Sequence, residues 1–388
     1  MNPRTRYSIP GLVGRSALEL VVVSNPETPD RTLAIKGLAP SPLPWLVESA
    51  RLVERMGAAD LAYPCNTAHY FLHRAPADMA PRLPLVDMIH ETAAEVAATG
   101  LTRVGLLATT GTISTRLYQE AFEARGVAVV VPEQTDVAPS GPDVEGEGRL
   151  TRAAYERLGV EPGRPLDPPR LAALVDFVVA RLGEQEGLVM ETIRGAFGVK
   201  AGFTSGVARQ LMFEAGRRLV ARGAEAIVLG CTEVPLVLNR RTAEVDGKTV
   251  PLVDATTVLA ERLLARPGPH GIAGGLGPEA TIDLLVKMGA PADFTDLQYA
   301  ILRATVSTLD ARRDQDHLKL LAIAGPDPID AARRLAAAGA AFLALSRGAA
   351  DAEAEVAAAT GLVVVADRPE RPAAPAIVRA AVAAAPTP

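Results

Sequence analysis

Short apolar runs alternate with amphipathic stretches along most of the chain. Apolar runs with the length of buried strands occur at 18–25, 59–64, 84–89, 103–109, 127–132 and 226–230. Stretches with the 3.6-residue period of amphipathic helices occur at 41–57, 114–126, 169–184, 205–223 and 255–266. This alternation predicts parallel sheets covered by helices on both faces, which is an α/β fold. Residues 136–169 are rich in Pro, Gly and acidic residues and predict a loop with one short helix.

A cysteine follows directly after two of the predicted strands. The stretch "AADLAYPCNTAHYF" (58–71) contains Cys65, and "AEAIVLGCTEVPLVL" (224–238) contains Cys231. In open α/β sheets, ligands bind in the crevice at the carboxyl ends of the strands, which is where both cysteines fall. A free cysteine is most often a small buried apolar residue. Polar residues follow both of these, however, which favours a crevice over a core.

Composition narrows the class of protein. The 388 residues are 48% hydrophobic and 22% charged, with a net charge of −5 and two cysteines. The length suits two or three domains, and the charge offers no basic patch for nucleic acid or an anionic membrane. Two cysteines cannot build a disulfide framework, and no apolar run reaches the roughly 18 residues of a membrane span. We therefore expect a cytoplasmic protein without nucleic-acid or membrane partners.

Two kinds of chemistry could use the cysteines. A zinc site is conceivable from Cys65, His69 and Cys231, but the sequence offers neither a fourth ligand nor the usual spacings, so we expect no metal. Proton transfer fits better, because a thiol can titrate near neutrality when polar groups favour its thiolate. Two thiols on opposite sides of one carbon could remove and replace a proton without a cofactor.

Several blocks of the chain resemble the aspartate/glutamate racemase family, whose members are independent of pyridoxal phosphate. "PCNTAH" and "GCTE" are similar to its paired cysteine motifs. "SNPETPDRT" (24–32), "LLATTGT" (106–112) and "GVKAGFT" (198–204) are similar to further blocks of the aspartate racemase branch, in the same order. The resemblance covers roughly residues 18–265.

The resemblance implies a fold and a reaction. It implies two similar flavodoxin-like domains with the active site between them, and an isomerase that uses no cofactor. One thiolate would deprotonate Cα and the thiol of the other cysteine would reprotonate it. The second motif ends in Glu233, where glutamate racemases typically have histidine. This favours aspartate or a broad substrate range over strict glutamate.

Candidate substrate-binding residues flank the motifs. In the family, the residues that match Arg31 and Lys200 contact the distal carboxylate of the substrate. Lys200 stands out because only 5 of the 40 basic residues are lysine, which suggests that a compact charge is needed there. We expect hydrogen bonds to the substrate from Asn66, Thr67, Thr109, Thr110, Thr112 and Thr232. The alternative for 109–112 is an ordinary helix start capped by Thr112 or Ser114. Asp30, His69 and Glu233 are expected to orient the residues that contact the substrate without contacting it themselves.

One family block is displaced. Family members normally open with a strand and glycine loop that resembles "GIAGGLGPEAT", which here lies at 271–281. We expect 271–288 to complete the first domain, so that Gly274, Gly275 and Gly277 line the active site. The alternative is an independent C-terminal sheet with strands at 319–324, 341–345 and 362–366.

The expected domain boundaries follow from these blocks. The first racemase-type domain would span 1–98, with the helix at 255–266 packing back on it, and the second would span 99–254. Residues 267–370 would form an α/β partial repeat of the first domain, because 339–353 aligns without gaps on 57–71, with Arg347 opposite Cys65. Residues 371–388 form an Ala/Pro-rich tail.

We expect an amino-acid racemase of the aspartate type that acts as a homodimer on a small amino-acid substrate. Two alternatives stay open. One is another enzyme of the superfamily, such as a diacid decarboxylase or a cis-trans isomerase. The other is an amino-acid-binding protein without activity, which the displaced glycine block suggests.

Overall fold

The chain forms two compact α/β units in the computed structural model. The structure describes residues 9–15, 18–25, 27–134, 144–145, 149–274, 278–300, 320–338 and 340–368. Unit 1 combines both ends of the chain, 1–88 and 259–388, and unit 2 is the continuous segment 89–258. The predicted α/β class is confirmed, with mostly parallel sheets in both units.

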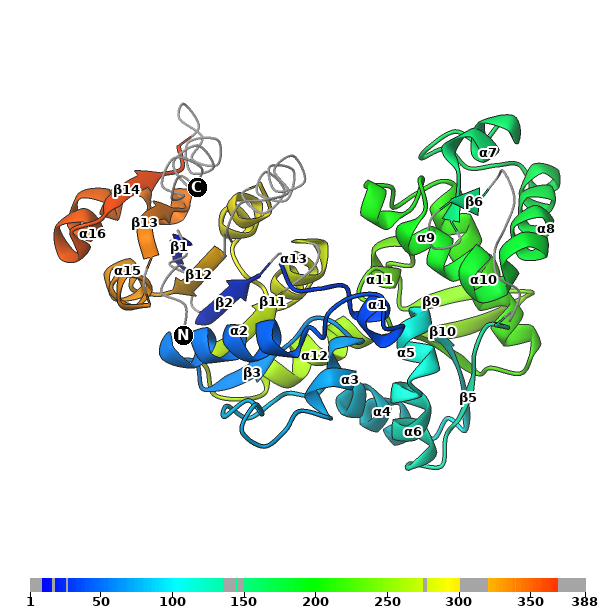
Figure 1. Ribbon diagram of the computed structural model, residues 1–388, viewed down its shortest axis with the longest axis horizontal. Helices are drawn as coiled ribbons and strands as arrows, with labels where there is room; N and C mark the ends of the chain where they lie inside the picture. The colour runs from blue at the N-terminus through cyan, green and yellow to red at the C-terminus, as the bar shows by residue number, and fades with distance from the viewer. Residues whose placement is uncertain are drawn as a thin grey trace. The chain divides into compact units, whose positions relative to one another are not determined.

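Unit 1 is built on one sheet whose seven described strands come from both ends of the chain (Figure 1). In sheet order the strands are β14 (Val363–Ala366), β13 (Ala340–Leu345), β1 (Ile9–Arg15), β12 (Leu320–Gly325), β2 (Leu20–Ser24), β11 (His270–Gly274) and β3 (Asp60–Ala62). Only the seam between β12 and β2 is antiparallel, and every other neighbouring pair is parallel.

The displaced block supplies an inner strand of this sheet. β11 lies between β2 and β3, with Ile272 opposite both Val22 and Ala62. At the start of the strand, the His270 ring lies 3.1 Å from a carboxylate oxygen of Asp60, and the Gly271 N–H donates to the other oxygen at 3.3 Å. Both partners of this pair are buried. The segment thus pairs with the first-domain strands, as expected from the sequence.

The C-terminal strands extend the same sheet and form no sheet of their own. β1 lies between β12 and β13, and β14 pairs with β13. The amino-terminal strand β1 therefore pairs with C-terminal strands, whereas β11, from the C-terminal segment, pairs with the amino-terminal strands β2 and β3. The two halves, β2-β11-β3 and β12-β1-β13, therefore repeat one arrangement, each with its inner strand from the other end of the chain. Because β12 and β2 are antiparallel, the strands of the two halves run in opposite directions, and their carboxyl ends lie on opposite sides of the sheet.

Helices cover both halves in equivalent positions. α2 (Leu43–Arg55) packs against β2 and β11 with a face that buries Leu46, Ala50 and Val53, and α15 (Pro328–Ala337) packs against β12, β1 and β13 (Figure 1). Arg334 of α15 donates to the Met56 carbonyl at the end of α2 at 2.8 Å, which ties the halves together. The remaining unit 1 helices include α1 (Arg31–Ile35), α3 (Ala68–Leu72), α13 (Pro278–Lys287), α16 (Glu353–Thr360) and most of α12 (Ala255–Leu264).

Unit 2 contains a second sheet with the order β5 (Ala128–Val130), β4 (Arg103–Leu107), β8 (Ala226–Leu229), β10 (Lys248–Asp254) and β9 (Thr242–Val245). The first four are parallel, and β9 is antiparallel to β10. Its helices include α4 (Met88–Ala98), α5 (Thr110–Ser114), α6 (Leu117–Glu123), α7 (Arg152–Arg157), α8 (Pro168–Glu184), α9 (Glu191–Arg194), α10 (Val207–Ala221) and α11 (Val234–Val237).

The elements that differ from the sequence prediction include a strand, a helix and a hairpin. The strand expected at 84–89 is reduced to a single bridge between Leu85 and Leu61, because α4 begins at Met88. The helix expected at 114–126 is broken at Arg116, whose φ is 57°. The β9–β10 hairpin was not predicted. It turns at Asp246 and Gly247, which both have positive φ, as such tight turns require.

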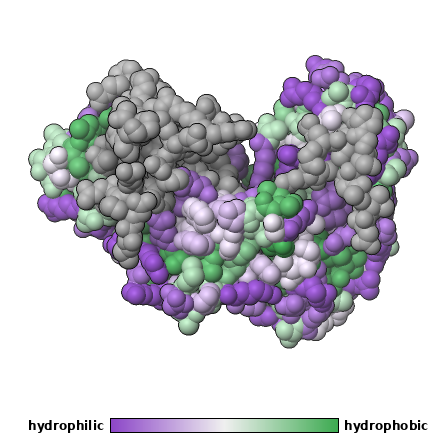
Figure 2. Space-filling view, in the orientation of Figure 1, coloured by the Kyte–Doolittle hydropathy of each residue, from purple (hydrophilic) through white to green (hydrophobic). Residues whose placement is uncertain are grey.

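No helix among the described residues is both long and apolar enough to cross a membrane. In the face shown in Figure 2, apolar side chains form small separate groups among polar ones.

Candidate active site

Cys65 lies where β3 turns into α3. Its N–H donates to the Tyr63 carbonyl at 2.7 Å, and its own carbonyl accepts from the Ala68 N–H at 3.2 Å, so the chain reverses tightly around it. Tyr63 is buried and its hydroxyl donates to the Leu46 carbonyl of α2 at 2.8 Å, which anchors the strand end. The cysteine itself is half-buried. A thiol at this turn is held in place while it stays accessible to a small molecule.

Arg31 is the charged partner of Cys65. Asp30 caps α1 by accepting from the Leu33 N–H at 3.0 Å, and this cap fixes the start of the helix. Arg31 is the first residue of α1, and its Nε donates to Cys65 Sγ at 3.3 Å. The guanidinium thus places a positive charge and an N–H donor directly beside the sulfur. Asp30 and Arg31 therefore lie with Cys65 in unit 1, where Arg31 contacts the sulfur directly.

His69 holds the backbone that carries Cys65. The Met88 N–H donates to Nε2 at 3.4 Å, so the proton of the neutral ring is on Nδ1, which donates to the Cys65 carbonyl at 3.0 Å. Burial lowers the pKa of His69 from its usual 6.5, against a smaller opposing effect of the Asp87 carboxylate. With both nitrogens engaged, His69 has no lone pair left to bind zinc.

The same edge of the sheet carries two polar residues that the sequence analysis did not select. Ser24 ends β2 and Asn25 follows it, and both are buried. Ser24 Oγ and Asn25 Nδ2 have no hydrogen-bond partner among the residues that the structure describes. The Asn25 N–H donates to the Gly274 carbonyl at 3.3 Å, so both residues lie where β2 and β11 end. They open the block at 24–32 that resembles the aspartate racemase branch, but their lack of partners depends on the tertiary packing and cannot be read from the sequence.

The remaining unit 1 candidates lie close to Cys65 or outside the described part. Asn66 and Thr67 are buried at the start of α3, 3% and 6% exposed. Gly274 ends β11, while Gly275 and Gly277 lie outside the described residues. Arg347, which aligns with Cys65, follows β13 in the other half of the sheet and pairs with Asp367 at 3.1 Å. The strand edge that carries Arg347 is thus opposite to the edge that carries Cys65.

Cys231 lies at the end of β8 in unit 2. Gly230 precedes it, and its N–H donates to the Leu107 carbonyl of β4 at 2.8 Å. A Cβ on Gly230 would lie 2.5 Å from Leu106 Cδ1, so a larger residue here would require the Leu106 side chain to move. Cys231 is 6% exposed.

Glu233 is the charged partner of Cys231. Cys231 Sγ donates to Glu233 Oε2 at 3.0 Å, and the Thr232 hydroxyl donates to the same oxygen at 3.0 Å. A carboxylate that accepts from Sγ favours the protonated thiol. The two cysteines therefore have partners of opposite charge, a cation for Cys65 and an anion for Cys231.

The threonines at 109–112 start α5 at the end of β4. Thr109 is the helix cap and accepts from the Thr112 N–H at 3.3 Å, which corrects the alternative of a cap by Thr112 or Ser114. The hydroxyls of Thr109 and Thr112 lie 3.1 Å apart, and the Thr110 hydroxyl donates to Glu186 at 2.5 Å. Leu107 and Leu229 are paired across β4 and β8, so Thr109 and Cys231 leave the sheet at the same edge.

Lys200 lies in a short helical turn, Val199–Ala201, that ends at Gly202 with a φ of 94°. The side chain is exposed and forms no hydrogen bond or ion pair with any residue that the structure describes. No described contact joins it to Cys231 or to the threonines.

Comparison with known proteins places these residues in a family. The sequence profile described as Asp/Glu/hydantoin racemase matches residues 3–160 and 171–263. An uncharacterized protein in the pnlA 3′ region of Pectobacterium carotovorum subsp. carotovorum is 26% identical over 181 residues, which is 47% of this chain and 83% of that protein.

Similar solved structures include three racemase-related proteins. An aspartate racemase homologue from Pyrococcus horikoshii OT3 is 20% identical, with 58% of this chain and 73% of that chain covered and a TM-score of 0.37. Picrophilus torridus aspartate racemase is 16% identical, with 71% and 98% covered and a TM-score of 0.37. Glutamate racemase from Francisella tularensis subsp. tularensis SCHU S4, in complex with D-glutamate, is 13% identical, with 73% and 94% covered and a TM-score of 0.40.

Proposed function

The chain belongs to the Asp/Glu/hydantoin racemase family, and on that premise we propose that it racemises an acidic amino acid through Cys65 and Cys231. The observation that carries the proposal is the opposite charge of the two thiol partners. Arg31 Nε donates to Cys65 Sγ at 3.3 Å, whereas Cys231 Sγ donates to Glu233 at 3.0 Å. One sulfur is thus set up to accept a proton and the other to give one.

The proposed reaction moves one proton off Cα and another onto it. The Cys65 thiolate takes the Cα proton, so the Cα–H bond breaks, an S–H bond forms and the electron pair stays on the carbon. The Cys231 thiol then gives its proton to the opposite face of Cα and becomes a thiolate. The product is the other enantiomer, and the reverse reaction starts from this second state, with Cys231 as the base.

Aspartate is the proposed substrate because cationic groups are available for a second carboxylate. Lys200 is exposed and has no partner among the described residues, which leaves its ammonium available. A guanidinium has five N–H donors, so Arg31 can contact Cys65 through Nε and still donate to a carboxylate. The Glu233 carboxylate replaces the histidine typical of glutamate racemases, which supports aspartate over glutamate.

The α-carboxylate of the substrate would bind to neutral donors at the strand ends. Asn66, Thr67 and Thr232 flank the cysteines, and Thr109 ends the strand next to Cys231. The Ser24 hydroxyl and Asn25 Nδ2 are buried without a partner among the described residues, and a bound carboxylate would give them one. A donor that is buried and unsatisfied costs free energy until such a ligand arrives.

The proposal is tested with purified protein and chiral chromatography. L-aspartate, L-glutamate, a neutral amino acid and a hydantoin are each incubated with the wild type, Cys65→Ala and Cys231→Ala in D₂O. We expect D-aspartate with deuterium at Cα from the wild type, and no racemisation by either variant with unchanged circular dichroism. Substantial racemisation by a single-cysteine variant would rule out the two-thiol reaction.

The same assay separates the alternatives. A decarboxylase or a cis-trans isomerase would consume a diacid without forming an enantiomer of it. Turnover of the hydantoin alone would place the chain elsewhere in its family. Binding of aspartate, measured by calorimetry, without any turnover would indicate a protein that only binds the amino acid.

A further inference from the structure

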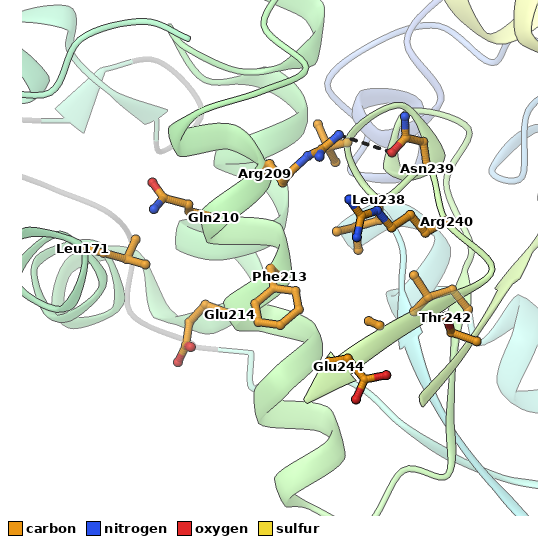
Figure 3. A pocket seen from close by; sticks show the side chains of 13 residues that line it. Leu171, Arg209, Gln210, Phe213, Glu214, Leu238, Asn239, Arg240, Thr242 and Glu244 are labelled. Carbon is orange, nitrogen blue, oxygen red and sulfur yellow. Dashed lines mark hydrogen bonds between the residues drawn. The ribbon is translucent and has the colours of Figure 1, made fainter. Parts of the chain in front are cut away.

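Unit 2 contains a cavity that the proposed reaction does not use. It has a volume of about 780 Å³ and lies between α10, the residues that follow α11, and the β9–β10 hairpin (Figure 3). This volume is within the roughly 300–1,000 Å³ range of small-molecule sites. Every residue of its lining belongs to unit 2, and Cys231 is not among them.

The middle of the cavity is apolar. Phe213 of α10 lies between Arg209 and Glu244 in Figure 3. The lining also includes Leu171, Leu238 and Leu252, which add aliphatic surface. Phe213 is 36% exposed and is the one large apolar side chain of unit 2, among the residues that the structure describes, that is exposed to this extent. An exposed aromatic ring inside a cavity provides apolar contact area for a ligand.

The basic residues of the cavity lining lie together at one end. Arg209, Asn239 and Arg240 gather at one end of the cavity in Figure 3. Arg209 donates to Asn239 Oδ1 at 3.2 Å, but its Nε is buried and has no partner in the described part of the chain. Arg240 forms no hydrogen bond or ion pair with any described residue. This end of the cavity therefore has two guanidinium groups with donors to spare.

The acidic groups of the lining are already paired. Glu214 accepts from Arg217 and Arg218 at 2.7–2.9 Å. Burial alone would raise the pKa of Glu214, but the bonds from these arginines outweigh burial and lower it, so the group stays ionised. Glu244 accepts from the hydroxyl of Thr249, its neighbour across the hairpin, at 2.6 Å. Arginines thus neutralise Glu214, and Glu244 lies away from Arg209 and Arg240 in Figure 3, so no lining carboxylate counters the positive charge at their end of the cavity.

We propose that this cavity binds an amphipathic organic anion, with its carboxylate between Arg209 and Arg240 and an apolar body against Phe213. Guanidinium groups bind carboxylates with paired hydrogen bonds, and Asn239 offers a further amide donor at the same end. Cys231 does not line the cavity, so binding of this anion can be measured independently of the racemase reaction.

The test uses isothermal titration calorimetry of the full chain with three probes of one shape. The probes are 4-phenylbutyrate, 4-phenylbutan-1-ol and 4-phenylbutylamine, which differ only in the charge of the end group. We expect saturable binding of the carboxylate with a Kd on the order of 1 mM, given its few atoms, and binding of the alcohol and the amine at least about tenfold weaker. Equal binding of the acid and the alcohol would overturn the recognition of an anion.

Variants locate the site. Arg240→Ala and Phe213→Ala should each weaken 4-phenylbutyrate binding at least severalfold. Arg241→Ala removes a neighbouring arginine that does not line the cavity, and should leave the Kd unchanged. Equal weakening by Arg240→Ala and Arg241→Ala would mean a general charge effect and would overturn the site, as would the absence of saturable binding. Cys231→Ala should bind the probe like the wild type, which separates this test from that of the racemase.

Discussion

At the scale of single residues, the sequence predicts the cysteines well and their partners only in part. Cys65 and Cys231 were selected because each follows an apolar strand, and both lie at strand ends in the structure. Arg31 was expected to bind substrate, yet its Nε contacts Cys65 across 34 residues of sequence. The helix cap by Asp30 fixes this contact. Asn25 was not predicted as a site residue, because only the packed sheet shows that its side-chain Nδ2 has no partner among the described residues.

Arg31 should control the reactivity of Cys65. In a Cys231→Ser background Cys65 is the sole thiol, and its alkylation by iodoacetamide at pH 7 reports the thiolate fraction. Arg31→Gln removes the cation next to Sγ, so we expect severalfold slower alkylation. Arg51→Gln, at an exposed position of α2, should not change the rate. Equal rates in both variants would mean that Arg31 does not act on the sulfur.

His69 should make the stability of the protein depend on pH. Burial lowers the pKa of His69 in the folded state, so below about pH 6.5 the unfolded chain binds a proton that the folded chain does not. Stability is then fully present above pH 6.5 and falls as the pH drops toward the lowered folded value. Urea unfolding at pH 7.5 and 5.5 should show a loss of up to about 1.4 kcal/mol that is absent in His69→Gln. The same loss in both proteins would contradict this assignment.

At the scale of elements, β11 fits its place between β2 and β3 closely. A Cβ on Gly271 would lie 2.3 Å from Val53 Cγ1 and 2.4 Å from the Asp60 carbonyl oxygen, which belongs to the backbone of the neighbouring strand. Glycine is therefore needed at position 271, where both α2 and β3 pack closely against β11.

Gly271→Ala should destabilise unit 1 by roughly 1–3 kcal/mol, because the added methyl forces the backbone of β11 away from β3. Urea unfolding measures this change. Gly216→Ala serves as a matched control in α10, where the nearest atom lies 3.8 Å from the added Cβ and alanine favours the helix. Comparable stability of Gly271→Ala and the wild type would show that β11 does not pack as described.

The elements that the sequence pattern predicts well are helices with one apolar face and strands with a continuous apolar run. α2 was expected at 41–57 and forms at Leu43–Arg55, and β12, β13 and β14 form within one residue of their expected positions. The hairpin β9–β10 is partly exposed, so its strands lack a long apolar run. The pairing of β11 with β2 and β3 was inferred from the displaced block, whereas the exchange of β1 into the other half was not. Pairing between strands that lie about 300 residues apart leaves no pattern in the sequence around either strand.

At the scale of the whole molecule, unit 1 depends on both ends of the chain. A fragment of residues 1–266 lacks β11, β12, β13 and β14, so β2 loses both neighbours and β3 loses the strand beside it. Unpaired backbone groups and an open core should leave this fragment insoluble or unfolded.

Solubility and circular dichroism of the fragment check this expectation. The matched control is residues 89–258, which keeps all five strands of the unit 2 sheet and should be soluble and folded. Racemisation of aspartate by 1–266 at the rate of the full chain would show that the C-terminal segment is an accessory.

The position of β11 also orders events on the ribosome. Residue 270 pairs with residue 20, so about 250 further residues must be made before the inner strand of the Cys65 half emerges. At roughly 5–20 residues per second, this delay is on the order of 10–50 s. Unit 2 is continuous and emerges complete within that interval, so it can fold first. Until β11 and β12 have been made, the nascent β2 has neither of its neighbours in the sheet. Its apolar run LVVV is then exposed to other nascent chains and to chaperones.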